Sequence, residues 1–161
     1  MSSGLRRVFA AVVLVGTLAI SGCVTPESYF PTLTNQARGA AGLGPLSTEP
    51  PGGMHFYNKA KAHAEAMCRA GAMYHSATDT QLGAYYQPPA GWRSLAENVG
   101  VTGWNQNDQN SQTASTNSLW NAFMNSPGHR AHILGSFNYQ VVAQQVCGDG
   151  KIYVTHVFIL Y

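Results

Sequence analysis

The chain has 161 residues, of which 10% are charged, and its formal net charge is +2. The basic pair Arg6-Arg7 precedes an apolar run that we expect to be cleaved off, which leaves seven of the nine basic residues against seven acidic ones. A neutral domain without blocks of like charge has no electrostatic footprint for nucleic acid, so we expect no nucleic-acid partner. The remaining length of about 140 residues suits one domain with one core.

The N-terminus has the pattern of a bacterial lipoprotein signal peptide over residues 1–22. Its apolar region, residues 8–20, is shorter than the roughly 18 to 20 residues that a spanning helix needs, although a plain membrane anchor is the alternative. Small residues then precede Cys23, as in a lipobox. We therefore expect cleavage before Cys23 and acylation of its thiol with chains such as palmitate. The protein would then be exported and lipid-anchored to the outer face of the cytoplasmic membrane.

The expected mature chain divides into a lipidated tether over residues 23–28 and a folded domain over residues 29–161. Apolar residues recur at helical spacing from Phe30 to Ala40, which predicts a first helix that ends at the glycines from residue 42. A Pro-Pro-Gly-Gly cluster then precedes a second, longer amphipathic helix over residues 54–72. The end of that helix leads into a loop that carries His75.

The middle of the chain is polar. Residues 103–116 are almost entirely Asn, Gln, Asp, Ser and Thr, so we expect a long surface loop there, after a short strand over residues 98–101. A short helix follows over residues 119–124 and must end before Pro127. Ser126 can then cap a new helix that has Pro127 at its first position and ends at Gly135.

The last quarter of the chain alternates as strands do. Gly148-Asp149-Gly150 separates two such runs and predicts a hairpin turn. The second run, residues 152–160, is apolar on both faces, so both faces should be covered by other elements. The fold class predicted from these elements is α+β: a three-layer α-β-α sandwich with a central, mainly antiparallel sheet.

Two cysteines remain if Cys23 is acylated. Cys68 and Cys147 form an even pair in an exported domain, which favours a disulfide. Closing a loop of about 79 residues would stabilise the fold by up to ~4 kcal/mol. The alternative is two unpaired buried thiols that pack as small hydrophobic groups.

Three polar residues from separate segments could converge on one site. His75, Glu97 and His129 supply two imidazoles and one carboxylate, the set of a His₂Glu zinc site with an open fourth position. Their spacing is unspecific, because no HExxH, CxxC or C₂H₂ pattern accompanies them. The alternative is that each residue caps a helix or forms hydrogen bonds locally.

The chain resembles the CAP superfamily, which includes cysteine-rich secretory proteins, antigen five and pathogenesis-related plant proteins. Five segments in the family's order carry the resemblance. They are Asn35-Gln36-Ala37-Arg38 with Gly42-Leu43-Gly44-Pro45-Leu46, Ala64-Glu65-Ala66-Met67 with His75-Ser76, Glu97-Asn98-Val99-Gly100, Asn125-Ser126-Pro127-Gly128-His129-Arg130-Ala131-His132-Ile133-Leu134, and Tyr153-Val154-Thr155-His156-Val157-Phe158. The resemblance implies an α-β-α sandwich with a cleft where two histidines and two acidic residues meet.

By this resemblance His75, Glu97 and His129 occupy three cleft positions, and Ser126 stands where the second acidic residue often is. Some family members bind zinc or another divalent cation in the cleft. With one carboxylate fewer, we expect a divalent cation such as zinc to bind here only weakly, through these three residues. We interpret His132 as a hydrogen-bonding residue and His156 as a residue of the core or the cleft wall.

We expect an extracytoplasmic binding module rather than an enzyme, because the cleft has no evident nucleophile and no catalytic residue can be named. Ser76 lacks a nucleophile-elbow sequence and is interpreted as a cap. The partner would be a small apolar ligand or a protein. One alternative is a cation-dependent hydrolase of peptides or cell-wall material, with Glu97 as base. Another is a cleft whose polar groups only tie loops to the sheet.

Overall fold

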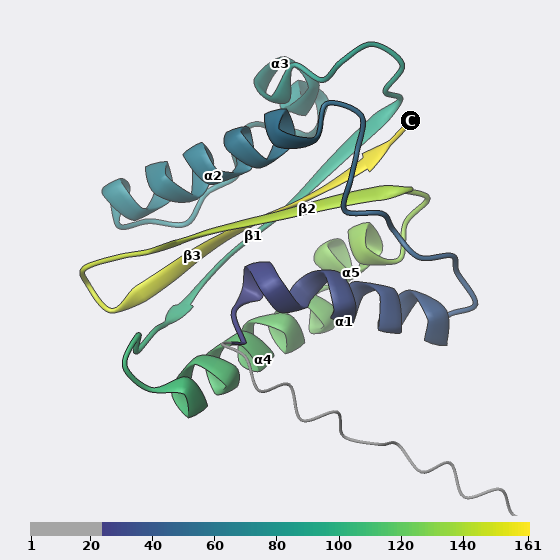
Figure 1. Cartoon of the computed structure of the whole chain (residues 1–161). Helices are drawn as coiled ribbons and strands as arrows, with labels where there is room; N and C mark the ends of the chain where they lie inside the picture. Colours follow the sequence, from purple (N-terminus) through teal and green to yellow (C-terminus); the bar gives the residue numbers. More distant parts are fainter. Residues whose placement is uncertain (1–23) are drawn as a thin grey trace, which may run out of the picture.

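The computed structural model describes residues 24–161, so the predicted signal peptide and the predicted lipidation site at Cys23 lie outside the described residues. Three strands form one antiparallel sheet in the order β1-β3-β2, with β1 at Ser94–Gly103, β2 at Tyr139–Val146 and β3 at Lys151–Leu160. Helices cover both faces (Figure 1): α2 (Gly53–Ala70) and α3 (Leu82–Tyr86) lie on one, and α1 (Pro26–Ala40), α4 (Gln109–Asn125) and α5 (Pro127–Ile133) lie on the other. The predicted three-layer sandwich is confirmed.

The central strand β3 is buried along nearly its whole length, as its apolar pattern on both faces predicts. Its hairpin with β2 turns at Gly148-Asp149-Gly150, where Gly150 has a φ of 74°. Because β1 pairs with β3 over ten residues, it is much longer than the predicted strand at residues 98–101. Each β1 residue therefore has a defined face, and adjacent polar residues on β1 point to opposite layers.

The polar segment at residues 103–116 is not a long loop, and that prediction is wrong. Helix α4 begins at Gln109, and Asp108 caps it by accepting hydrogen bonds from the N–H groups of Asn110 and Ser111. The buried side of α4 extends into this polar segment through Gln112 and Thr116, whose side chains form hydrogen bonds there. Gln112 donates to the backbone oxygen of Asn105, and Thr116 donates to that of Val24.

Helix α1 also starts earlier than expected, at Pro26, inside the segment predicted as a tether. A capping box fixes this start, because the Ser28 N–H donates to the Thr25 hydroxyl oxygen and the Thr25 N–H donates to the Ser28 hydroxyl oxygen. Near the other end, buried Arg38 donates to the backbone oxygens of Ile133 and Gly135 at 3.0 and 2.7 Å. These bonds fix the C-terminal end of α5, and so help to position the histidines that α5 carries.

The predicted disulfide is confirmed: Cys68 and Cys147 are joined, with their Cα atoms 5.9 Å apart. The bond links the last turn of α2 to the residue after β2. Helix α2 ends at Gly71, which has a φ of 63°, and the chain turns back along the sheet. This returning segment carries His75 and leads to a 3₁₀ turn at Asp79–Gln81 and to α3, neither of which was predicted.

Candidate binding cleft

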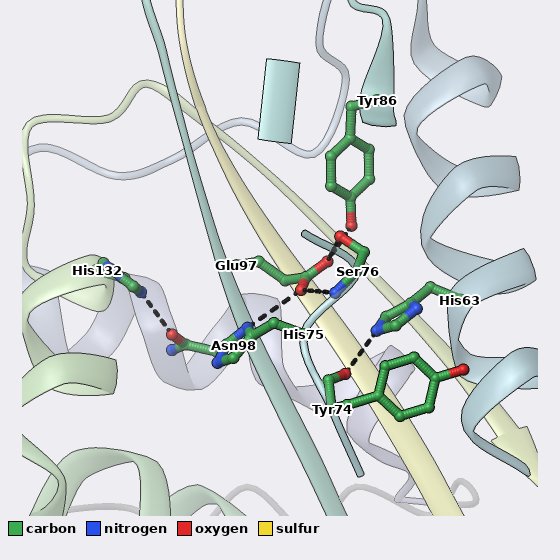
Figure 2. A network of polar contacts seen from close by, with 8 residues as sticks. All are labelled: His63, Tyr74, His75, Ser76, Tyr86, Glu97, Asn98 and His132. Carbon is green, nitrogen blue, oxygen red and sulfur yellow. Dashed lines mark hydrogen bonds and ion pairs between the residues drawn. The ribbon is translucent and has the colours of Figure 1, made fainter. Parts of the chain in front are cut away.

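Glu97 lies at the centre of a network of polar contacts (Figure 2) and is only 1% exposed. The hydroxyl of Tyr86 donates to Oε2 at 2.5 Å, and the hydroxyl of Ser76 donates to the same oxygen at 2.7 Å. The other oxygen, Oε1, accepts from the Ser76 backbone N–H at 2.9 Å and lies 3.2 Å from Nδ1 of His75. Burial, and then the charge of Glu97, raise the pKa of Tyr86 well above its ordinary value, so Tyr86 stays a donor.

The segment that supplies Ser76 and His75 is held in place by helix α2. His63, buried on α2, donates from Nε2 to the backbone oxygen of Tyr74 at 2.8 Å, and its ring packs edge-on against the Tyr74 ring (Figure 2). This bond sets the position of the next two residues along the chain. Ser76 thus serves as a donor to Glu97 rather than as the helix cap that was predicted.

Asn98, the next residue on β1, performs the corresponding task on the opposite face. Its Nδ2 donates to the backbone oxygen of His129 at 3.1 Å, and its Oδ1 accepts from Nδ1 of His132 at 2.7 Å. Figure 2 shows the contact with His132, on the far side of β1 from Tyr86. The predicted hydrogen-bonding role of His132 is therefore confirmed. Because Glu97 and Asn98 are consecutive, β1 couples the layer of α2 to that of α5 at this point.

His129 lies against the ring of Phe123, with the ring centroids 4.9 Å apart. Its Nδ1 is buried and has no hydrogen-bond partner within residues 24–161. Burial, followed by the nearby His75 and His132, lowers the pKa of His129. Burial also lowers the pKa of His132, while Asp79 acts in the opposite direction. Both imidazoles are therefore neutral near pH 7.

An open cleft of about 790 Å³ lies between α5 and the part of the returning segment from His75 to Gln81. Three of the four residues expected at the cleft, His75, Ser126 and His129, line it, while Glu97 lies buried behind His75. Ser126 is the residue before α5, as predicted, but its side chain makes no capping hydrogen bond. A second hollow of about 240 Å³ adjoins the cleft and shares Ser126 and His129 with it.

The expected zinc ligands do not come together as a three-residue site in this arrangement. Residues 24–161 contain no group of three or more His, Cys, Asp or Glu side chains that could hold a metal ion. The carboxylate of Glu97 already has contacts at both oxygens, and His75 directs Nδ1 to that carboxylate rather than outward. The donor set in this arrangement does not fit a three-ligand metal site, so we derive no chemistry through a metal.

Sequence reasoning missed several residues of the site. Tyr86 and Asp79 come from the unpredicted α3 and 3₁₀ turn, and no pattern links Tyr86 to a carboxylate eleven residues later. The pair Tyr85-Tyr86 was the one available signal, because a tyrosine that is buried needs a partner for its hydroxyl. His156 matches its prediction as a core residue: it is 0% exposed and lies 3.1 Å from Gln140.

The fold and the cleft can be compared with known proteins. At the level of structure the chain is similar to an outer surface protein from Borrelia burgdorferi, with a TM-score of 0.62 and 13% identity over 84% of this chain and 92% of that one. It is also similar to an extracellular protein containing a SCP domain from Bacillus anthracis, with a TM-score of 0.58 and 20% identity. That match covers 84% of this chain and 40% of the other.

At these identities the two solved structures show the fold alone, and none of the curated proteins compared with the chain matches it. Within the described residues, no helix is both long enough and apolar enough to cross a membrane. The family profile described as "CAP: Cysteine-rich secretory protein family" matches residues 32–159, which is most of the chain. The chain therefore belongs to the CAP cysteine-rich secretory protein family.

Proposed function

We propose that this CAP domain is a non-enzymatic binding module, held by a lipid on Cys23 at the outer face of the cytoplasmic membrane. Its cleft binds an extracytoplasmic ligand, either a protein segment or a small apolar molecule. One observation carries the proposal: the carboxylate of Glu97 is buried and used structurally. The acidic residue of the cleft thus stabilises the cleft's walls and is not free to react with a bound molecule.

A general base must reach the proton that it removes, directly or through one water molecule. Glu97 is 1% exposed and does not line the cleft, and its oxygens accept hydrogen bonds from Tyr86 and Ser76. Ser76 donates to this carboxylate, so it is not paired with an imidazole as an activated nucleophile would be. No observation favours the cation-dependent hydrolase as a second candidate, because the metal ligands and the base that it requires do not converge.

Support for the location comes from the N-terminus and from the named relatives. Both similar solved structures are described as outer surface or extracellular proteins. Helix α1 begins at Pro26, three residues after the expected acylation site, so the lipid would hold the domain close to the membrane surface. A diacylglyceryl group carries two chains, which is enough for stable anchoring.

The experiment compares ligand retention by three forms of the purified protein. Gly128 lines the cleft, and a Cβ added there would have no other atom within 4 Å, so we expect Gly128→Trp to place its ring in the cleft without distorting α5. Gly39→Trp is the matched control, because Gly39 also has open space around its Cα but lies on α1, outside the cleft. Co-purifying molecules are identified by mass spectrometry, and melting temperatures show that all three forms are folded.

We expect a ligand that is retained by the original protein and by Gly39→Trp and is lost from Gly128→Trp. An identical set of molecules on all three proteins would contradict the proposal. The proposal would also be contradicted if the original protein turned over a peptide or cell-wall substrate and Gly128→Trp abolished that turnover.

A further inference from the structure

The two edges of the sheet differ. The edge of β2 is occupied within the domain: the Gln140 N–H donates to the Ser47 oxygen at 2.8 Å, and the Ser47 N–H donates to the Asn138 oxygen at 3.0 Å. Further along, Lys61 donates from Nζ to the backbone oxygen of Gln144 at 2.8 Å. An occupied edge cannot accept another strand, and a lysine on an edge also discourages pairing. The β2 edge is therefore partly occupied by the chain itself, although a hollow of about 570 Å³ lies beside Gln140, Val141 and Val142.

The edge of β1 has backbone groups that point away from the sheet. Just beyond the last pair of its ladder with β3, Gly103 with Lys151, Trp104 donates its N–H to the Gly150 oxygen at 2.7 Å. Hydrogen-bonded pairs alternate along an antiparallel ladder. The backbone N–H and C=O groups of the even-numbered residues of β1 therefore point toward β3, and those of the odd-numbered residues point away from the sheet. The outward carbonyl of Glu97 interacts with His132. Within the described chain, the outward groups of Val99 and Val101 have no hydrogen-bond partner.

These two residues form the floor of the 240 Å³ hollow beside the cleft, which we call the β1 groove. Its walls are apolar: Met73 of the returning segment lies on one side, and Leu119 and Phe123 of α4 lie on the other. The α4 wall packs closely on the strand, since a Cβ added to Gly100 would lie 2.6 Å from Leu119. Val99 is only 2% exposed, so a partner reaches its backbone groups only when the half-exposed side chain of Met73 moves aside. The β1 groove is thus a channel along a strand edge, with backbone donors and acceptors at its base.

We propose that the β1 groove binds an extended peptide, which adds to the edge of β1 as a fourth strand and places an apolar side chain between Met73 and Phe123. An acyl chain would fit the apolar walls but would leave the N–H and C=O groups of Val99 and Val101 without partners, which costs free energy in a covered site. A peptide strand provides both apolar side chains for the walls and partners for the backbone groups. Its main-chain hydrogen bonds supply affinity, and pockets select alternate side chains.

The end of the groove supplies a second feature that suits a peptide. His129 lies where the groove meets the cleft, and its buried Nδ1 has no partner in the described chain. Because this nitrogen is buried, a peptide amide that continues from the groove into the cleft would provide a partner only when the His129 ring turns toward the cleft. This inference rests on the proposed binding function and specifies its ligand class.

The probe is a phage-displayed library of linear heptapeptides, selected on the purified protein. The readout is amide hydrogen exchange followed by NMR. Without peptide, the Val99 and Val101 amides should exchange faster than those of Gly100 and Thr102, which are bonded to β3. Saturating peptide should slow exchange at Val99 and Val101 and leave Gly100 and Thr102 unchanged. Selected peptides that leave the exchange at Val99 and Val101 unaltered would overturn the inference.

A substitution on the strand tests the same bonds. Val101→Pro removes only the outward N–H, and proline is tolerated on an edge strand at a position that does not bond inward. Val101→Thr is the control, since it keeps the N–H and the branched shape. We expect Val101→Pro to weaken peptide affinity about tenfold, in line with the loss of one buried hydrogen bond, and Val101→Thr to leave it within about twofold. Equal affinity for both variants, at matching melting temperatures, would refute strand addition.

Three other results would also overturn the inference and would bear differently on the proposed function. Failure to select any peptide, together with exchange protection of Val99 and Val101 by palmitate micelles, would leave a binding module whose ligand is a lipid. Protection that grows with protein concentration alone would indicate edge-to-edge pairing of two copies. Peptides that bind the protein and its Gly128→Trp variant equally, without protecting β1, would contradict both the groove and the cleft as binding sites.

Discussion

Glu97 shows how much of the cleft depends on single hydrogen bonds. A buried carboxylate requires hydrogen-bond partners at both oxygens, and Tyr86, Ser76 and His75 provide these contacts from two separate segments. The residues around it differ in how visible they are in the sequence. Glu97 and His75 stand out as isolated polar residues in a weakly charged chain. Tyr86 does not, because its role depends on α3 folding over β1, which no local pattern indicates.

Replacing Tyr86 by phenylalanine should show how much its hydrogen bond to Glu97 contributes to the free energy of unfolding. Tyr86→Phe leaves the buried carboxylate without one donor, so we expect the free energy of unfolding to fall by about 1–3 kcal/mol. Tyr85→Phe is the control, because the Tyr85 hydroxyl donates to the backbone oxygen of Lys59 at 3.3 Å and makes no hydrogen bond to Glu97. Urea denaturation measures both. An equal loss in the two variants would show that Tyr86 does not support Glu97.

His156 provides a second prediction at this scale, for pH. Full burial lowers the pKa of His156 to about 3. The unfolded chain takes up a proton near pH 6.5 and the folded one does not, so stability falls as the pH drops from 6.5 toward 3. Between pH 7 and pH 4 this residue alone should remove about 3 kcal/mol. His156→Gln should flatten that dependence in denaturation curves measured at both pH values, and an unchanged slope would contradict the prediction.

At the scale of elements, the sequence predicts the helices and strands whose buried positions are apolar. It does not predict those whose buried positions are polar. The hairpin of β2 and β3 and the long helix α2 follow from the period of their apolar residues. Helix α4 could not be predicted over its first two turns, because its buried positions there are Gln112 and Thr116. Their burial is favourable only when partners from distant segments are in place, such as the backbone oxygen of Val24. That information is tertiary.

The disulfide between α2 and the end of β2 should be worth a large part of the domain's stability. Removing it as the double variant Cys68→Ala with Cys147→Ala frees a loop of 79 residues in the unfolded chain. We expect the free energy of unfolding to fall by up to ~4 kcal/mol. Chemical denaturation measures this, and the original protein under reducing conditions is the control, which should lose a similar amount. No loss in either sample would contradict the prediction.

For the whole molecule, family membership accounts for the three-layer architecture, and the structure shows how the cleft residues of this chain are arranged within it. The three layers and the β1 edge follow from elements that the sequence mostly predicts. The arrangement of the cleft does not follow, because it depends on how Glu97 and Asn98 each bind a different layer. The expectation of a metal site assumed that the carboxylate would face the histidines in the cleft. In the folded chain Glu97 accepts hydrogen bonds from Tyr86 and Ser76 instead.

Anchoring is a property of the whole chain and can be tested separately. Cys23→Ala removes the thiol that we expect to be acylated, so the protein should lose its lipid and appear in the soluble fraction or remain unprocessed. Membrane fractionation with mass spectrometry of the N-terminus measures both results. Cys68→Ala is the control, since it removes a cysteine that the disulfide already uses. Fractionation of Cys23→Ala identical to that of the original protein would refute lipidation.

The central claim is that Glu97 serves as a structural acceptor rather than as a metal ligand in the cleft, and calorimetric titration with zinc tests it most directly. With Glu97 engaged, we expect no saturable zinc binding at micromolar concentration near neutral pH, and weaker binding still for calcium and magnesium, which prefer oxygen ligands. His75→Ala and His129→Ala should then change the titration little. Saturable micromolar zinc binding that both substitutions abolish would contradict the claim and would restore the cleft as a metal site.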